Sequence, residues 1–570
     1  MNKLTTIASS LALTLYGSIT LAQSVECSGL LGVQSEASTI IEAKIVEGGS
    51  QIEGSSVRGS ICRVRGVARP SSDSEIKFEV WLPTVAAWTG RMKLSGTGGF
   101  AGGVPYASLA RDVGDGFVAA GSNMGHDGGE SPSWTMGHPE KVKDWGLRAH
   151  YYVATAAKSL ANAHYGKPVD YSYFAGCSNG GRQALLLAQN YPKLFNGIVA
   201  VAPSNYYPDL LFWLIYSGKV QKPEFDKPPV LSADKQQLIN QRVIAACDAV
   251  DGVTDGQVTN PRACKFDVDS LGPKGDRSLS EVELATAKAM YAGTRSEAGQ
   301  QRYPGVSLGS EKDWAPNFAD NGGYGTFVGH FVYGTRTPPF QWRKDINFSG
   351  VYDKAFSALT PFTSAPSPDL KEFRANGGKL IQLHGWNDPL VPPTGSIAYH
   401  RSVAVMEDLR ALPAFEFDRK IDELTPDAVR TSIARQSRNV NEFHRLFMMP
   451  GVAHCGGSVG ADAVGGGMTE PPESYRKPET HSVNALMQWV EGKKAPERIV
   501  ATKFNGNTLV HSRPICAWPA QAKYIGSGDT NDAKNFRCEV VQGLNESVEE
   551  SEMLLIRSAL RQRDVRVPNR

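Results

Sequence analysis

Short apolar runs alternate along the chain with longer segments in which apolar residues recur at helical spacing. Apolar runs that end in turn residues are typical of buried strands in a parallel sheet. Six of them predict strands, at residues 92–95, 116–121, 171–176, 197–202, 379–383 and 445–449. Between them, helical periodicity predicts helices at 148–165 and 182–190. This alternation predicts an α/β fold.

The alternation is interrupted in the middle of the chain. From about residue 204 to 369 the sequence is rich in aromatic residues, glycine and proline, and sheet-like sequence resumes at Lys379. A separate tail domain would not be followed by more of the sheet, so we expect an insertion above the carboxyl ends of the strands. The predicted organisation is a core of residues 23–203 and 370–541, a lid domain at 204–369, and an extension at 542–570. The charged extension predicts either a terminal helix or a disordered tail.

Composition and charge narrow the class of protein. The chain has 570 residues, of which 41% are hydrophobic and 21% charged, and its formal net charge is +2. This length and composition predict a large globular protein with a substantial core. The sequence has no run of Lys and Arg of the kind that binds nucleic acid. Beyond the N-terminus it also has no uncharged apolar stretch of about 18 residues, the length needed to span a membrane. We therefore expect neither partner for the mature chain.

The first 22 residues have the pattern of a secretory signal peptide. Lys3 supplies a short positive region, residues 7–16 an apolar stretch, and residues 20–22 a small-residue cleavage site before Gln23. A membrane anchor is the alternative, but the apolar stretch is short and is interrupted by polar residues. We expect cleavage and a secreted or periplasmic protein.

All eight cysteines lie beyond this segment, and an even number in an exported chain favours disulfide bonds over free thiols. Pairing nearest neighbours predicts Cys27–Cys62, Cys247–Cys264 and Cys516–Cys538. This leaves Cys177 to pair with Cys455.

Residues 176–180, Gly-Cys-Ser-Asn-Gly, fit the G-x-S-x-G nucleophile elbow, a turn that lifts a serine hydroxyl out of a sheet. Ser178 is the candidate nucleophile, and the backbone N–H of Asn179 is a candidate oxyanion donor. A second donor normally comes from a glycine-rich loop after an earlier strand. The segment Gly96-Thr97-Gly98-Gly99 follows such a strand, although a tight structural turn is the alternative.

The acid and the base of a catalytic triad also have candidates. Asp388 follows the predicted strand 379–383, and His454 follows 445–449. The chain order Ser178, Asp388, His454 is the order found in α/β-hydrolases. A bond between Cys177 and Cys455 would tie the nucleophile to the base.

Other residues could take these roles. Asp251 and Asp255 are acids, but they lie in the insertion and suit a metal better. His126 in Gly-His-Asp-Gly is expected to hydrogen-bond a loop rather than act as a base. Cys177 could be a thiol nucleophile, but its expected role is the disulfide.

The segment 247–257 has acidic residues interspersed with glycines, which suits a hard cation bound only by oxygen. It lacks the closing Glu of an EF-hand, and no Cys/His cluster has zinc spacing. A solvated acidic turn is the alternative. The expected ligands are three carboxylates and two backbone carbonyls, from Asp248, Asp251, Asp255, Val253 and Gln257. We expect the ion to stiffen the insertion, and we expect no organic cofactor.

The chain resembles the tannase/feruloyl esterase family of α/β-hydrolases, which includes the mono(2-hydroxyethyl) terephthalate hydrolases. The resemblance runs from about Cys27 to Cys538 and rests on segments 173–182, 386–389 and 454–455. It implies an α/β-hydrolase fold with a large inserted lid domain and a structural Ca²⁺ in the acidic loop. It also implies an oxyanion donor at a position that matches Gly99.

The resemblance implies a carboxylic ester hydrolase acting on small aromatic esters, with feruloyl esters preferred over galloyl or terephthalate esters. The terephthalate enzymes hold the free carboxylate with a lid arginine, and the matching position near Gly322 has none. An aromatic cluster predicts either an acyl pocket or a buried lid core, with Tyr324, Phe327, His330, Phe331 and Tyr333 as members. Val391 is a further candidate for the pocket. An acyltransferase and a non-catalytic binding module are the remaining alternatives.

Overall fold

The computed structural model describes residues 24–129, 131–224, 226–273, 278–314, 322–334, 340–541 and 547–563, apart from the side chain of Phe331. The expected signal peptide at 1–22 lies outside the described residues. So do parts of the extension, namely 542–546 and 564–570.

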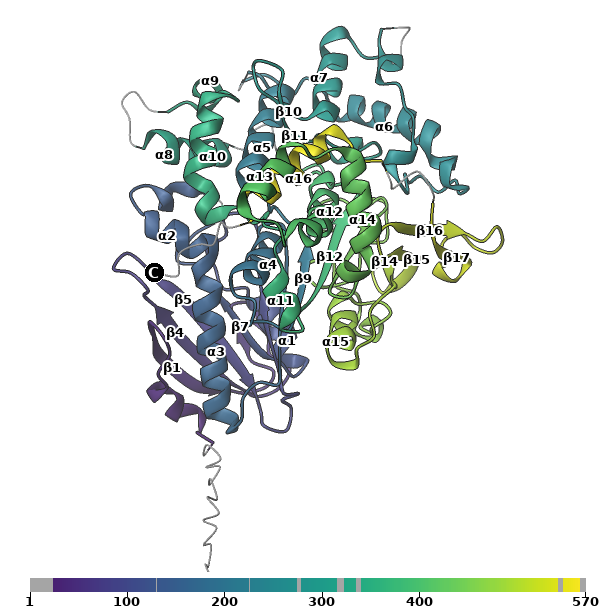
Figure 1. Ribbon diagram of the computed structural model, residues 1–570. Coiled ribbons are helices and arrows are strands. Elements are labelled where there is room, and N and C mark those ends of the chain that lie inside the picture. Colours follow the sequence, from purple (N-terminus) through teal and green to yellow (C-terminus); the bar gives the residue numbers. More distant parts are fainter. Residues whose placement is uncertain are drawn as a thin grey trace, which may run out of the picture.

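A nine-stranded sheet with the order β1-β4-β5-β7-β6-β8-β9-β12-β13 forms the centre of the molecule (Figure 1). The first strands pair antiparallel as far as β7, and all pairs from β7 to β13 are parallel. The sheet confirms the predicted α/β fold. Its strands are β1 Ser38–Val46, β4 Ile61–Ala68, β5 Ile76–Pro83, β6 Arg91–Ser95, β7 Val118–Ser122, β8 Tyr171–Cys177, β9 Gly197–Val201, β12 Lys379–Gly385 and β13 His444–Met449.

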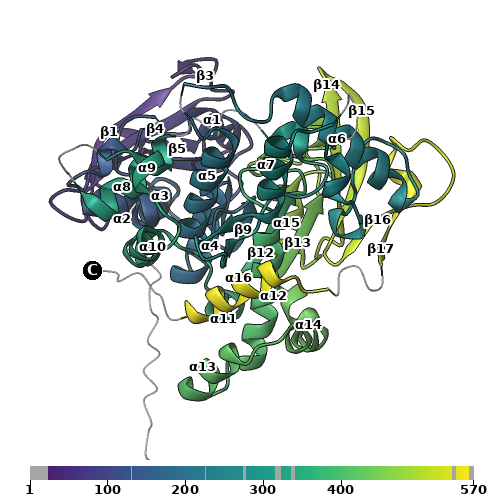
Figure 2. The ribbon, with the colours of Figure 1, turned by 90° about the horizontal axis from the view of Figure 1, so that it is seen from above.

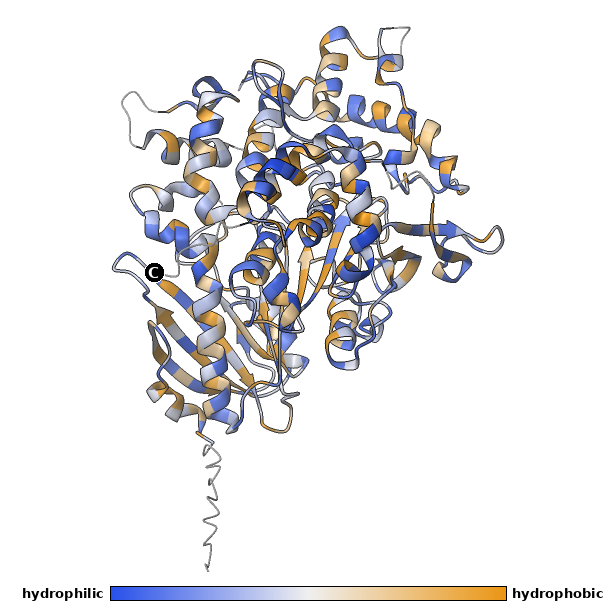
Figure 3. Ribbon diagram, in the orientation of Figure 1, coloured by the Kyte–Doolittle hydropathy of each residue, from blue (hydrophilic) through white to orange (hydrophobic). Residues whose placement is uncertain are grey.

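Helices cover both faces of the sheet, because alternate residues of the buried strands point to opposite sides. Along β9, Ile198 and Ala200 join the core cluster of one face, while Val199 and Val201 join that of the other. The first face packs against α3 Ala149–Tyr165, α4 Asn179–Asn190 and α12 Thr394–Leu409. The second face packs against α1 Tyr106–Gly114 and α15 Ser482–Gly492. Hydrophobic colour accordingly concentrates on the central strands (Figure 3).

Most of the chain between β9 and β12 lies above the sheet in Figure 1, although its last helix, α11 Lys371–Ala375, lies beside the sheet, and none of its described residues joins the nine-stranded sheet. Its main elements are α5 Tyr207–Gln221, α6 Ala233–Cys247, α7 Glu281–Ala292, β10 Thr294–Arg295, β11 Gln301–Tyr303, α8 Gly322–Tyr333, α9 Trp342–Asp345 and α10 Gly350–Thr363. A buried carboxyl lies in its core, where Asp209 accepts a hydrogen bond from the Tyr352 hydroxyl. Burial raises the pKa of Asp209 to about 7, although the hydrogen bond from Tyr352 opposes the shift.

Two antiparallel pairs and a helix follow the sheet. The pairs are β14 Arg498–Asn505 with β15 Thr508–Cys516, and β16 Ala520–Tyr524 with β17 Phe536–Val540. Helices α13 Ala414–Asp422 and α14 Pro426–Asn441 extend from one side (Figure 2). The extension was expected to be either a terminal helix or a disordered tail. Its described part contains a helix, α16 Glu550–Arg561. Glu552 of this helix is buried between Arg401 of α12 and Arg262 of the insertion.

Four disulfide bonds join all eight cysteines, in the pairs Cys27–Cys62, Cys177–Cys455, Cys247–Cys264 and Cys516–Cys538. These are the pairs expected from the sequence. So many bonds are typical of proteins that fold in an oxidising compartment. Within the described residues, no helix combines the length and the apolar character needed to cross a membrane.

Candidate active site

Ser178 lies at the turn from β8 to α4, in a backbone conformation that few residues adopt. Its φ is 62° and its ψ is −120°. The turn is tight because glycines let backbone meet backbone: a Cβ on Gly176 would lie 2.8 Å from Gly180, and one on Gly96 would lie 2.7 Å from Gly180. Only glycine fits such contacts. The strained turn is the one that the elbow motif predicted.

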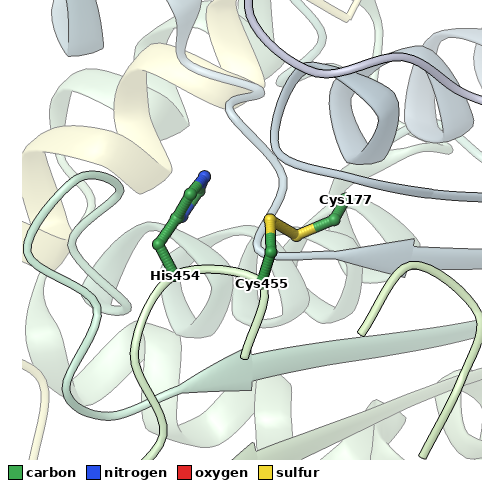
Figure 4. Close-up of side chains that lie close together, drawn as sticks. All are labelled: Cys177, His454 and Cys455. Carbon is green, nitrogen blue, oxygen red and sulfur yellow. A yellow bond between two sulfur atoms is a disulfide. The ribbon is translucent and has the colours of Figure 1, made fainter. Parts of the chain in front are cut away.

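A disulfide bond connects this turn to the loop that carries His454 (Figure 4). Cys177 and Cys455 have Cα atoms 5.9 Å apart, and they bring together segments 278 residues apart in sequence. A ring nitrogen of His454 lies within 4.8 Å of both sulfur atoms. Because both sulfurs are in the disulfide, Cys177 has no thiol to act as a nucleophile, and the group is not a thiolate metal site.

Asp388 follows β12 and is fully buried, and both of its carboxylate oxygens accept hydrogen bonds. Oδ2 lies 2.6 Å from His454 Nδ1, and Oδ1 accepts from the backbone N–H groups of Leu390 and Val391, each at 2.9 Å. Burial opposes ionisation of Asp388, but the nearby His454 and the hydrogen bonds from His384 and His454 outweigh it. Together they hold the pKa of Asp388 well below its usual range, so the carboxylate is ionised.

A second buried imidazole, His384 of β12, contacts the same carboxylate. Its Nε2 lies 3.2 Å from Asp388 Oδ2 and 2.8 Å from the Val391 carbonyl oxygen, while its Nδ1 accepts a hydrogen bond from Ser396 Oγ at 2.6 Å. Both neighbours of Nε2 are acceptors, so Nε2 carries the proton. His384 was not among the predicted site residues, although its place four residues before Asp388, at the end of the same strand, was a usable signal.

The two predicted oxyanion donors belong to the start of α4 and to the loop after β6. Asn179 is the first residue of α4, where backbone N–H groups have no partner within the helix. Gly99 has a φ of 50° in the loop after β6. Gln183 of α4 holds this loop, since its Oε1 accepts from Thr97 N at 3.1 Å and its Nε2 donates to Thr97 Oγ1 at 3.3 Å.

Arg182 is another residue that the sequence analysis did not single out, although it belongs to the quoted motif. It is fully buried, and its Nε donates to Asn179 Oδ1 at 2.7 Å. One terminal nitrogen donates to the carbonyls of Gly146 and Thr363, both at 3.0 Å, and the guanidinium stacks 4.6 Å from the Trp145 ring. Burial lowers the pKa of Arg182 to about 10. Arg182 therefore ties the start of α4 to the inserted segment.

The aromatic residues singled out in the insertion occupy different environments. Phe327 is fully buried, and its ring lies 4.9 Å from that of Phe100, the residue after Gly99. His330 Nδ1 lies 3.0 Å from Thr135 Oγ1, whose hydroxyl donates to the Pro132 carbonyl oxygen. The side chain of Phe331 lies outside the described residues. Val391 is buried, and its backbone binds Asp388 and His384.

The other candidate acids and base lie elsewhere. His126 donates through Nε2 to the carbonyl oxygen of Phe100 at 2.7 Å and stacks on Trp134 at 3.9 Å, which is the loop-holding role expected for it. Asp251 and Asp255 lie in the acidic loop rather than beside His454.

The acidic loop wraps its backbone around its own carboxylates. Asp248 accepts from the N–H groups of Asp255 and Gly256, at 3.1 and 2.9 Å. Burial raises the pKa of Asp251 and of Asp255, and Arg513 forms an ion pair with Asp255. An oxygen-only donor set in which burial opposes ionisation suits a hard cation. Among the described residues, however, no three carboxylate or imidazole ligand atoms lie within 4.8 Å of one another, so these carboxylates do not converge on one point.

Comparison with known proteins identifies the family of this chain. The family model described as tannase and feruloyl esterase matches residues 62–539. An uncharacterized esterase of Xanthomonas campestris pv. campestris is 35% identical over 91% of this chain and 92% of its own length. A probable feruloyl esterase B-2 of Aspergillus terreus is 30% identical over 85% of this chain and 87% of its own.

Among solved structures, feruloyl esterase B from Aspergillus oryzae superposes with a TM-score of 0.77. The match covers 89% of this chain and 98% of that one at 24% identity, and it confirms the α/β-hydrolase type of fold. The matched span includes the elbow, the Asp388 loop and the His454 loop. The chain therefore belongs to the tannase and feruloyl esterase family of carboxylic ester hydrolases.

Proposed function

We propose that this protein is a secreted serine esterase that cleaves esters of phenolic acids through an acyl-enzyme on Ser178. One observation carries the proposal: the imidazole that is hydrogen-bonded to an ionised, buried Asp388 belongs to a loop that a disulfide joins to the residue next to Ser178. This arrangement supports Ser178 as nucleophile, His454 as base and Asp388 as the acid that orients the base.

The roles follow from the atoms. His454 Nδ1 binds Asp388, so Nε2 is the nitrogen available to take the proton of Ser178 Oγ as this oxygen attacks the ester carbonyl carbon. The N–H groups of Gly99 and Asn179 stabilise the oxyanion, and His454 returns the proton to the departing alcohol. Water then attacks the acyl-enzyme, with His454 again as the base. This step releases the free acid and regenerates the Ser178 hydroxyl. Asp388 fixes the imidazole tautomer and favours its charged form.

The substrate class is supported by two observations. Several relatives, among them the Aspergillus terreus protein, are named as feruloyl esterases. Phe327 of the insertion packs on Phe100 beside the Gly99 loop, and these two buried rings could form the aromatic wall behind a pocket for an aromatic acyl group. We further propose that residues 204–369 form a lid domain over the site, and that Phe327, His330, Phe331 and Val391 belong to its pocket.

We also propose that Asp248, Asp251 and Asp255, with the carbonyl oxygens of Val253 and Gln257, hold a structural Ca²⁺. Bound there, the ion would balance carboxylates whose ionisation burial opposes. The ion stiffens the insertion and takes no part in the ester chemistry.

The test is the initial rate of hydrolysis of methyl ferulate, methyl gallate and mono(2-hydroxyethyl) terephthalate by the purified mature protein. We expect methyl ferulate to be preferred. Ser178→Ala is expected to lower turnover by about 10⁴-fold or more without changing the thermal midpoint, because only the nucleophile is lost. Activity retained by Ser178→Ala would refute the nucleophile, and preference for gallate or terephthalate would change the substrate class.

A further inference from the structure

One turn of the inserted segment, Gly309–Asp313, contacts both loops that carry Asp388 and His454. Asn387, which is buried and precedes Asp388, donates through Nδ2 to the Gly309 carbonyl oxygen at 2.7 Å. Ser458, four residues after His454, donates through Oγ to Asp313 Oδ2 at 2.7 Å. The same Asp313 oxygen lies 3.4 Å from Asn387 Nδ2. The turn therefore bridges the acid loop and the base loop.

The turn is itself firmly held by Glu311, whose side chain is fully buried. Glu311 Oε1 accepts from Gly309 N and from the Tyr291 hydroxyl, both at 2.7 Å, and Oε2 accepts from Asn240 Nδ2 at 2.8 Å. Asn240 belongs to α6 and Tyr291 to α7. Because hydrogen bonds to a buried carboxylate are strong, these two helices fix the position of the turn.

The loop that carries His454 and Ser458 has a strained backbone. Cys455 has a φ of 60° and Ser458 a φ of 68°, values that are rare for residues other than glycine. On the core side, Lys503 Nζ donates to the Ser458 carbonyl oxygen at 2.7 Å, and Asp462 Oδ2 accepts from Gly457 N at 2.8 Å. Such strain persists only where surrounding contacts enforce it. The side chain of Ser458 contributes the contact with the insertion.

We propose that Asp313 is a positioning residue for the reaction, which acts through Ser458 and Asn387 to set the distance between the Asp388 carboxylate and the His454 imidazole. This inference rests on the proposed function. It means that the insertion, besides covering the site, aligns the acid and the base. A displacement of about 1 Å in such a pair can slow a reaction about 100-fold.

The test compares Asp313→Ala, Asp313→Asn and Ser458→Ala with Lys312→Ala, a matched control on the same turn. The readouts are kcat and KM for p-nitrophenyl acetate, the rate at which a fluorophosphonate labels Ser178, and the thermal midpoint. We expect Asp313→Ala to lower kcat and the labelling rate about 10- to 100-fold with KM nearly unchanged. Asp313→Asn keeps an oxygen that can accept from Ser458 and is expected to retain most of the rate. Lys312→Ala is expected to match the wild type.

The double variant Asp313→Ala/Ser458→Ala separates this role from general support of the fold. Since Ser458 acts through its hydrogen bond to Asp313, the double variant is expected to be about as slow as the slower single variant. Multiplicative losses, or a kcat for Asp313→Ala equal to that of Lys312→Ala, would overturn the inference. If Asp313→Ala does not fold, Asp313→Asn and Ser458→Ala still test the inference. A Ser458→Ala enzyme with the wild-type kcat would contradict it. A wild type that neither labels nor turns over would instead overturn the triad itself.

Discussion

Removing the Cys177–Cys455 bond should affect stability and chemistry together. In the double variant Cys177→Ala/Cys455→Ala, the unfolded chain regains the freedom that a cross-link over 278 residues removes. In the chain-entropy model this costs about 6 kcal/mol of unfolding free energy. The Cys247–Cys264 bond inside this loop spans only 17 residues, so it changes the value by less than about 0.1 kcal/mol. A loss of this size is comparable with the whole stability of many proteins.

Equilibrium unfolding in urea gives the change in stability, and the rate of fluorophosphonate labelling of Ser178 gives the change in alignment. The matched control is Cys27→Ala/Cys62→Ala, whose bond spans 35 residues and joins the first 3₁₀ turn to β4. We expect this control to lose about 4 kcal/mol by the same model and to label at the wild-type rate. The Cys177 variant should label at least about 10-fold more slowly. Unchanged labelling would refute the view that the bond aligns Ser178 with His454, and equal stability losses in the two variants would refute the loop-length reasoning.

Two further predictions concern the inserted segment. A folded-state pKa of about 7 at Asp209 means that the folded protein holds a proton that the unfolded chain releases, so this contribution to stability is lost as the pH rises from about 4 to about 7. Between pH 5 and pH 8 the wild type should therefore lose about 2.5 kcal/mol relative to Asp209→Asn in urea unfolding, and parallel pH dependences would contradict the burial argument. Calcium at about 100 times its Kd should raise the unfolding free energy by about 3 kcal/mol over EDTA, and Asp251→Ala should abolish the difference. Equal thermal midpoints of the wild type in calcium and in EDTA would mean that the loop holds no such ion.

The sequence predicted the parallel half of the sheet well and missed the antiparallel half. The strands β6, β7, β8, β9, β12 and β13 are short, largely apolar and buried on both faces, so their pattern is readable without tertiary information. In β4 and β5 the apolar pattern is broken by charges: Arg63 forms two hydrogen bonds with Glu79, at 2.8 and 2.6 Å, across the strand pair. A charged residue inside a strand interrupts the apolar pattern, so the strand is not predicted unless the partner of the charge is known.

The same distinction applies to the candidate site. Ser178 is recognisable because the glycines that its turn requires are its near neighbours in sequence, and Asp388 and His454 because each follows an apolar strand. The supporting contacts are not recognisable in this way. Asp313 lies 145 residues from Ser458, and nothing in its local sequence distinguishes it from a solvated acid on a turn. The contact exists only because the insertion folds back onto the loops of the core.

The buried Glu552 has a consequence for the way the protein matures. Its carboxylate faces Arg401 from the core and Arg262 from the insertion, and all three side chains are nearly inaccessible to water. Without α16, two guanidinium groups would lie close together without their shared counter-charge, at a cost of several kcal/mol. The ribosome synthesises this helix after both of its partners, so a growing chain that has not reached it cannot complete its native contacts. The buried contact at which core and insertion share one carboxylate can therefore form only after α16 has left the ribosome, however early Arg262 and Arg401 were made.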